Sequence, residues 1–250
     1  MTQMRAARVG ACLLLGCAFA WTRQALAYRP FDGTDAEVAA PREVELELGP
    51  LGYVRQGDEH FLVGPALVLN YGIAPDFELV LEGRQLWSLD HARDSELEDV
   101  ALSLKSLLRK GSLQGASGVS VALETGLLLP GSERRFGAHL ASILSWHWPA
   151  LTLHLNLGND LLTSVHYTAS SSLILEGPLA WRVRPVAEIL AARDFGGPKL
   201  ASGLERSVLL GAIASFSQSW SFDLALRHGR LDGQQIDEAR LGFTWAFAGD

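Results

Sequence analysis

The chain has 250 residues, of which 48% are hydrophobic, and its 21 Lys and Arg against 28 Asp and Glu give a net charge of -7. This length allows one large all-β domain or two smaller domains, and the acidic balance argues against nucleic acid as a partner. The 2 cysteines are Cys12 and Cys17, so the chain beyond them offers no disulfide, thiolate metal site or cysteine nucleophile.

The first 27 residues have the pattern of a secretory signal peptide. Two arginines precede an apolar run over 9–20, and small residues lead up to Ala27, which predicts cleavage between Ala27 and Tyr28. The run is too short to span a bilayer as an anchor. Leu-Gly-Cys at 15–17 leaves lipidation of Cys17 as the alternative. Cleavage removes three arginines and no acid, so 18 basic residues remain against 28 acidic ones, a net charge of -10.

Residues 28–42 are polar and contain Pro and Gly, and we expect them to form an N-terminal periplasmic extension. From 43 onward, apolar and polar residues alternate, as in "EVELELG" (43–49) and "WSFDLALRH" (220–228). A period of two predicts β-strands, and no helical period of 3.6 is sustained. The predicted strands are 43–56, 60–73, 77–89, 97–109, 119–130, 137–148, 151–158, 169–178, 183–194, 204–216, 220–229 and 237–247.

These strands favour an all-β fold, an antiparallel up-and-down transmembrane β-barrel of about 12 strands, with 10 or 14 as alternatives, over residues 43–250. Short turns at 74–76, 149–150 and 217–219 largely alternate with longer polar connections, such as 158–168 and 230–236. Tryptophan favours a membrane–water interface, and five tryptophans lie beside the short turns. They are Trp146, Trp148, Trp181, Trp220 and Trp245. A soluble β-sandwich or lipocalin-like barrel is the alternative, but it gives no reason for this clustering.

The last strand, "RLGFTWAF", has one apolar, largely aromatic face. Arg240, Gly242, Trp245 and Phe247 resemble the C-terminal signal that bacterial outer-membrane barrels present to the barrel-assembly machinery, although three residues follow the aromatic here. An unpaired amphipathic strand is a template for pairing, and in a closed barrel this strand must pair with the first one.

Longer stretches resemble the putative MetA-pathway of phenol degradation family, a group of outer-membrane proteins. The similar segments are "EVELELGPLGY", "FLVGPALVLNYGI", "FELVLEGR", "SLILEGPLAW" and "RPVAEIL". The resemblance implies a barrel associated with transport, with hydrophobic or aromatic solutes suggested by the family name, and it implies no catalytic residues.

The polar faces of the predicted strands carry most of the charged residues. Their functional interpretation is a water-filled, acid-rich lumen that favours neutral or cationic solutes, and the alternative is a lumen closed by salt bridges. The lumen-lining candidates are Glu45, Glu47, Glu78, Glu82, Arg84, Lys105, Glu124, His154, Glu176, Glu188, Asp223, Arg227, Glu238 and Arg240.

An enzyme is a further alternative to a channel. If residues 149–150 form a two-residue turn, Ser145 lies opposite His154, with Asn156 nearby, as a lipid hydrolase would need. Serine and histidine facing each other on a wet wall are more often structural. His139 and His147 are too far apart along one strand for a metal site, and no nucleotide-binding motif is present.

We therefore predict an outer-membrane channel or transporter for small solutes, with no enzymatic activity and no cofactor. The alternatives are a non-conducting structural or interaction barrel and, more remotely, a lipid hydrolase. The expected partners are outer-membrane lipid, the barrel-assembly machinery and an unidentified small solute, with no nucleic acid.

Overall fold

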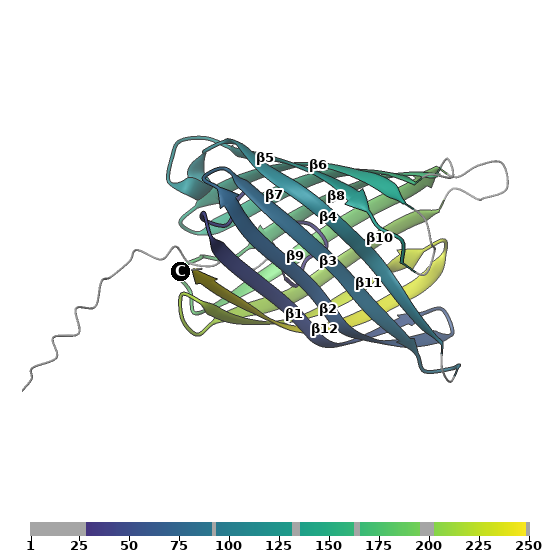
Figure 1. Ribbon diagram of the computed structural model, residues 1–250. Coiled ribbons are helices and arrows are strands. Elements are labelled where there is room, and N and C mark those ends of the chain that lie inside the picture. Colours follow the sequence, from purple (N-terminus) through teal and green to yellow (C-terminus); the bar gives the residue numbers. More distant parts are fainter. Residues whose placement is uncertain (1–28, 92–93, 132–135, 163–165, 196–202, 249–250) are drawn as a thin grey trace, which may run out of the picture.

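The computed structural model describes residues 29–91, 94–131, 136–162, 166–195 and 203–248, and the signal peptide predicted over 1–27 lies outside them. Twelve antiparallel strands in these residues form one closed barrel, in which each strand pairs with its neighbours in sequence and β1 pairs with β12 (Figure 1). The strands are β1 (Glu43–Gln56), β2 (Glu59–Ala74), β3 (Phe77–Ser88), β4 (Ser95–Arg109), β5 (Ser120–Leu128), β6 (Gly137–Trp148), β7 (Leu151–Leu162), β8 (His166–Glu176), β9 (Val183–Phe195), β10 (Leu204–Ser215), β11 (Trp220–Leu231) and β12 (Gln234–Ala248).

A short 3-10 helix, η1 (Ser112–Gln114), lies between β4 and β5. No helix in the described part of the chain is long and apolar enough to cross a membrane. The barrel wall is taller than predicted in two places, because β7 continues to Leu162 and β12 begins at Gln234. The loops predicted at 158–168 and 230–236 are correspondingly shorter.

The two faces of the wall follow the alternation of the sequence, with the apolar face outside. On β11, Leu224 is 59% exposed, whereas the neighbouring Asp223 is 3% exposed. A soluble sandwich or lipocalin-like barrel would turn its leucines inward to remove them from water, so the observed orientation rules out that alternative. The interior of the barrel, here called the lumen, receives the polar side chains.

The barrel closes as the sequence predicted. β12 pairs with β1 in a register that places Phe247 opposite Val44 and Ile236 opposite Gln56, with a bulge between Leu48 and Leu51. Closure leaves no unpaired sheet edge, which a hydrocarbon environment requires.

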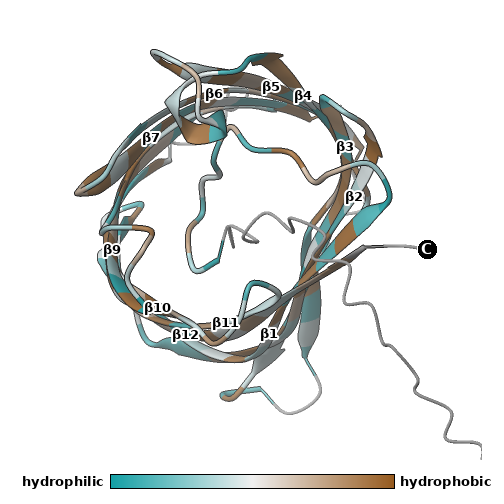
Figure 2. Cartoon of the chain, turned by 90° about the vertical axis from the view of Figure 1, so that its left-hand side faces the viewer, coloured by the Kyte–Doolittle hydropathy of each residue, from teal (hydrophilic) through white to brown (hydrophobic). Residues whose placement is uncertain are grey.

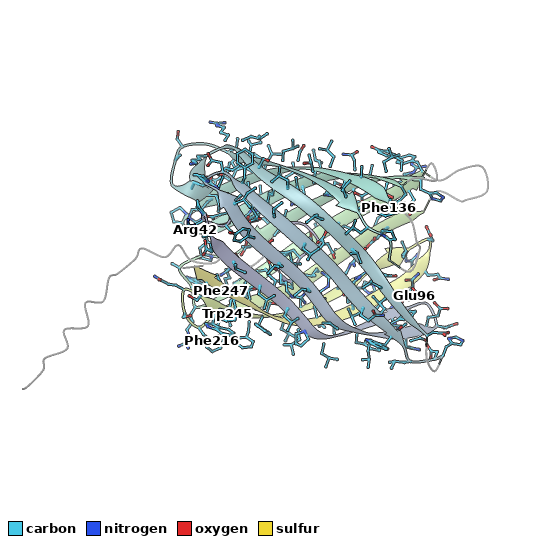
Figure 3. All side chains as sticks on the ribbon, in the orientation of Figure 1. Arg42, Glu96, Phe136, Phe216, Trp245 and Phe247 are labelled. Atoms are coloured by element: carbon cyan, nitrogen blue, oxygen red, sulfur yellow. The ribbon has the colours of Figure 1, made fainter. Side chains whose placement is uncertain are left out.

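The short turns gather at the rim where the chain ends, which we call the C-terminal rim. It carries the connections between β2 and β3, between β6 and β7, and between β10 and β11. Trp245, Phe247 and Phe216 lie at this rim, and Glu96 and Phe136 lie toward the opposite one (Figure 3). The Trp245 ring stacks on Trp220 at 5.1 Å between centroids, so both belong to one aromatic cluster on the outer surface.

The N-terminal extension was predicted to be periplasmic, and its described part, residues 29–42, instead folds into the lumen. Figure 2, which looks along the barrel, shows this stretch inside the ring of strands. We call residues 29–42 the luminal segment. It lies inside because wall side chains supply hydrogen bonds that its own backbone, which forms no strand, leaves unmet.

Candidate functional site

The lumen-lining candidates lie on the interior face of the wall. All but two are buried, and Glu82 and Arg84 are partly exposed. The buried residues are Glu45, Glu47, Glu78, Lys105, Glu124, His154, Glu176, Glu188, Asp223, Arg227, Glu238 and Arg240. Burying so many charges requires ion pairs or hydrogen bonds, and many of these are made to the luminal segment.

Hydrogen bonds from two wall side chains fix the middle of the luminal segment. The carboxylate of Glu188 on β9 accepts the backbone N–H groups of Asp32 (2.8 Å) and Gly33 (2.9 Å). The amide of Asn156 on β7 accepts the N–H of Thr34 (3.1 Å) and donates to its carbonyl (2.9 Å). Asn156 thus satisfies both backbone groups of Thr34, as a neighbouring strand would.

The following residues contact further strands of the ring, from β6 to β3. The N–H of Ala36 donates to Ser145 Oγ on β6 at 2.9 Å, and the N–H of Ala39 donates to Glu78 Oε2 on β3 at 2.5 Å. The side chain of Gln114 in η1 donates to the carbonyl of Ala36 at 2.9 Å. Glu78 on β3 and Glu188 on β9 lie on opposite sides of the ring, so the luminal segment occupies the lumen rather than one wall.

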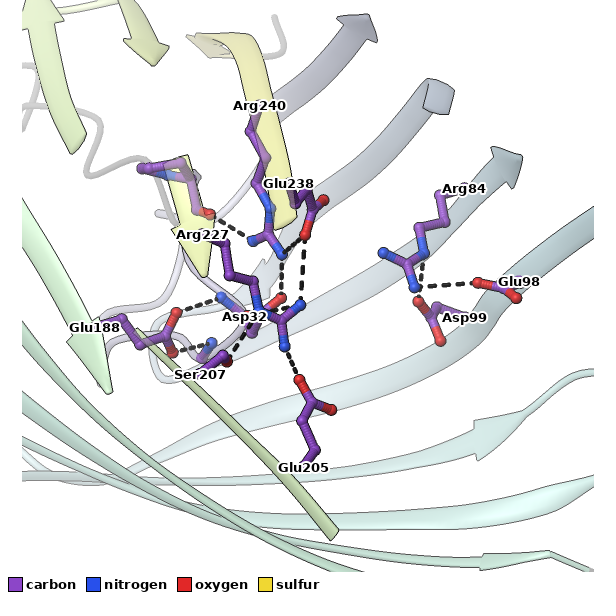
Figure 4. A network of polar contacts seen from close by, with 12 residues as sticks. Asp32, Arg84, Glu98, Asp99, Glu188, Glu205, Ser207, Arg227, Glu238 and Arg240 are labelled. Atoms are coloured by element: carbon purple, nitrogen blue, oxygen red, sulfur yellow. Dashed lines mark hydrogen bonds and ion pairs between the residues drawn. The ribbon is translucent and has the colours of Figure 1, made fainter. Parts of the chain in front are cut away.

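Asp32 is the charged centre of the site (Figure 4). Its carboxylate lies 2.7 Å from Arg240 Nη2 and 3.6 Å from Arg227 Nη1. Arg240 also donates to Glu238 at 2.8 Å, and Arg227 also contacts Glu205. Burial by itself would raise the pKa of Asp32, but the charges of Arg240 and Arg227 outweigh it and lower that pKa to about 2. Asp32 is therefore an anion at neutral pH.

A second ion-pair group lies across the lumen. The Lys105 side chain on β4 is 1% exposed, and its Nζ lies 3.6 Å from Asp35 and 3.8 Å from Glu78. The same Nζ donates to the Thr34 hydroxyl at 3.3 Å. An acidic residue of the luminal segment thus faces a basic wall residue on each side of the barrel.

Two close approaches depend on glycine. A Cβ added to Gly33 would lie 2.3 Å from Ser172 Oγ, and one added to Gly242 would lie 2.3 Å from Arg29 Nε. Arg29 uses the space above Gly242 to reach Asp223, with Nε 3.7 Å from its carboxylate. Gly242 belongs to the predicted C-terminal assembly signal, and in the folded barrel it also makes room for the luminal segment.

The serine of the hydrolase hypothesis is enclosed, and its hydroxyl is bonded to the luminal segment. Ser145 does pair with His154, and its Oγ lies 2.8 Å from His154 Nδ1. The other ring nitrogen of His154 contacts Glu176 (3.0 Å), not Asn156, and Glu176 also binds Arg184 (2.7 Å). Ser145 is 0% exposed. These residues form a chain of hydrogen bonds that ends on the N–H of Ala36, which is an anchor for the luminal segment.

His139 and His147 also have structural partners. His139 Nδ1 lies 2.6 Å from Asp160, and His147 Nδ1 lies 2.9 Å from the Thr152 hydroxyl. Within the described ranges, no group of three or more His, Cys, Asp or Glu is arranged to hold a metal ion.

A cavity of about 210 Å³ remains beside the luminal segment. It is bordered by the segment on one side and by wall residues of β1 to β9 on the other. Its ionisable lining residues are Arg29, Asp32, Glu47, Glu78, Glu82, Lys105, Glu124 and His139. This cavity is an unfilled part of the lumen next to the luminal segment.

Several residues of this site are not among the lumen-lining candidates predicted from the sequence. Arg184 and Asn70 occupy inward-facing positions in the alternation of their strands, so the period of two could have identified them. Asp32, Thr34 and Asp35 carry no such signal, because their contacts are made with residues far away in the sequence.

The structure is similar to outer-membrane channel barrels. The COG4313 outer membrane channel from Pseudomonas putida F1 matches with a TM-score of 0.68 at 11% identity, over 87% of this chain and 100% of that one. The NanC porin matches with a TM-score of 0.55 at 10% identity (81% and 98% covered), and the KdgM porin with 0.51 at 14% (81% and 99%). The chain therefore has the fold of these β-barrels.

No family model and no curated protein sequence matches the chain. The resemblance to the MetA-pathway of phenol degradation family thus stays a prediction.

Proposed function

We propose that this protein is an outer-membrane channel for small solutes whose passage is narrowed by its own luminal segment. The observation that carries the proposal is a closed barrel with an apolar outer face and a charged lumen, in which residues 29–42 leave a cavity of about 210 Å³. Signal-directed export, insertion by the assembly machinery and a position in outer-membrane lipid belong to the same proposal.

The size of the barrel supports passage. Eight strands enclose a space that side chains just fill, and the twelve strands here enclose room for the luminal segment and the cavity beside it. Among the charged lining residues, acidic side chains outnumber Arg29 and Lys105. An acid-rich passage favours neutral or cationic solutes, so we propose these as the solute class.

The second candidate is a structural barrel that does not conduct. It is favoured by the many contacts that hold the luminal segment, which come from opposite sides of the ring. We do not propose a hydrolase, because the serine that would act as nucleophile is enclosed by the wall and by Ala36.

Single-channel recording in planar bilayers tests the proposal. We would compare the chain starting at Tyr28 with a variant that lacks residues 29–39, and use deletion of residues 248–250 as the control. We expect the chain starting at Tyr28 to show a small conductance that prefers cations, and the variant without residues 29–39 to show a severalfold larger conductance. The control should conduct like the chain starting at Tyr28. If neither the full chain nor the shortened one conducts, the structural-barrel interpretation holds. Equal conductance would mean that the luminal segment does not restrict the passage.

A further inference from the structure

Three arginines form a row on the outer surface of the barrel. Arg206 on β10 lies directly opposite Arg230 on β11, and Arg193 on β9 lies two residues beyond Ala191, the residue paired with Arg206. Directly opposed residues have Cβ atoms about 5 Å apart, and diagonal ones remain within reach of long side chains. Arg193, Arg206 and Arg230, on three consecutive strands, are here called the arginine row.

The arginine row faces away from the lumen, near the rim opposite the C-terminal rim. All three arginines are exposed, whereas Ser207 and Gly229, the strand neighbours of Arg206 and Arg230, are buried and face inward. Toward the C-terminal rim the same outer face continues with exposed Val208, Leu210, Leu224 and Leu226. The arginine row thus lies at the edge of this apolar surface that is farther from the C-terminal rim, and in the proposed location the apolar surface borders lipid.

Arg206 and Arg230 carry positive charge that no ion pair among the described residues balances. Two arginines directly opposite each other repel. In the described part of the chain, neither Arg206 nor Arg230 forms an ion pair or side-chain hydrogen bond. The nearby outward-facing carboxylate of Asp237 is already engaged by Arg55 (2.5 Å) and His228 (2.6 Å). Asp232, in the next turn, accepts the N–H of Leu204 at 3.0 Å.

The two arginines also share a concave surface. Arg206, His228 and Arg230 line a shallow hollow together with Leu204, Gly229 and the turn at Asp232 and Gly233. Guanidinium groups bind phosphate through paired, charge-assisted hydrogen bonds. A cation above an apolar wall matches a lipid that carries a phosphate above its acyl chains.

Outer-membrane barrels have short periplasmic turns and longer extracellular loops, so the C-terminal rim, which carries the short turns, faces the periplasm in the proposed location and the arginine row faces outward. We propose that the arginine row binds the phosphate of a phosphorylated lipid in the outer leaflet, with the acyl chains on the apolar surface of β10 and β11. The proposal rests on the outer-membrane location proposed above, but not on conduction. It gives Arg206 and Arg230 one shared function, which is to bridge the same phosphate and so remove their mutual repulsion.

Lipid binding by purified protein in detergent tests the proposal. Native mass spectrometry would measure binding of lipid A and of the same glycolipid without its phosphates. The variant is Arg206→Gln with Arg230→Gln. The control is Arg182→Gln, which removes an exposed arginine near the C-terminal rim whose guanidinium lies 5.4 Å over the Phe216 ring. We expect the wild type and the control to prefer phosphorylated lipid A, and the double variant to bind it at least tenfold more weakly.

Equal binding of the two lipids, or an equal loss in the control, would overturn the proposal. So would stabilisation of the folded band on heating by inorganic phosphate alone to the same extent as by lipid A, because that indicates a site for a free anion. Conductance of the wild type would be recorded in parallel. If the wild type conducts but shows no preference for lipid A, only the lipid site is rejected. If it prefers lipid A but does not conduct, only the channel is rejected.

Discussion

Replacing Asp32 by asparagine tests whether charge holds the luminal segment in the barrel. The change keeps the shape of the side chain and the backbone hydrogen bonds to Glu188, and it removes the negative charge that faces Arg240 and Arg227. Both arginines retain Glu238, and Arg227 also retains Glu205. The wall should therefore stay folded while the segment is held less tightly.

The expected magnitude follows from the pKa of Asp32. Its fall from 3.8 to about 2 corresponds to about 2.5 kcal/mol of interaction with the folded surroundings, at about 1.4 kcal/mol for each pKa unit. The side chain is 25% exposed, and water screens the pair, so we expect about 1–2 kcal/mol. At about 1.4 kcal/mol per factor of ten, this raises the undocked fraction of the segment roughly tenfold.

Hydrogen exchange over residues 30–40 measures this fraction, because the amides of Asp32, Gly33, Thr34 and Ala36 are bonded to wall side chains. We expect about tenfold faster exchange in Asp32→Asn and no change in Asp237→Asn, which breaks an ion pair on the outer surface. Unchanged exchange in Asp32→Asn would refute the argument that charge holds the segment.

Four further predictions concern pH, the outer face, assembly and export. The pKa of folded Asp32 lies below its ordinary value, so the exchange difference between wild type and Asp32→Asn should be constant above about pH 4 and vanish as pH falls to about 2. Leu224→Arg should lower the free energy of unfolding in lipid vesicles by about 2–4 kcal/mol if the position is near the midplane, whereas the apolar control Leu224→Met should cost far less in the same urea titration. Phe247→Ala should reduce the heat-modifiable folded band in outer-membrane fractions more than it reduces the yield of refolding into detergent, whereas deletion of 248–250 should reduce neither quantity. If Phe247→Ala inserts in cells with the yield of the wild type, the assembly-signal interpretation is wrong. N-terminal sequencing should find Tyr28 first, and an acylated Cys17 would contradict this.

The barrel could be predicted from the sequence because strand periodicity is local. On β11, every second residue from Trp220 to Leu226 is apolar, and this alone places Phe222 and Leu224 on one face and Asp223 on the other. The pairing of Ser145 with His154 also followed from the sequence, since a two-residue turn determines the register on both of its sides. Both are confirmed in the structure.

The contents of the lumen could not be predicted in the same way. The alternation along the strands predicted that Glu188, Arg227 and Arg240 face inward, but it did not show what they bind. Glu176, rather than Asn156, is the partner of His154, because neighbouring strands decide which inward side chains meet. The stretch from 28 to 42 has no periodicity, and its polar composition suits water as well as a polar lumen.

The sequence by itself determined the strands, their two faces and the closure of the barrel, because a period of two and the tight turns constrain residues close together along the chain. Only the tertiary structure decided that residues 29–42 lie in the lumen. That position depends on contacts such as Asp32 with Arg240 and Ala36 with Ser145, which are separated by more than a hundred residues. Such contacts exist only after the wall has closed, since closure brings the charges of opposite strands around one short segment.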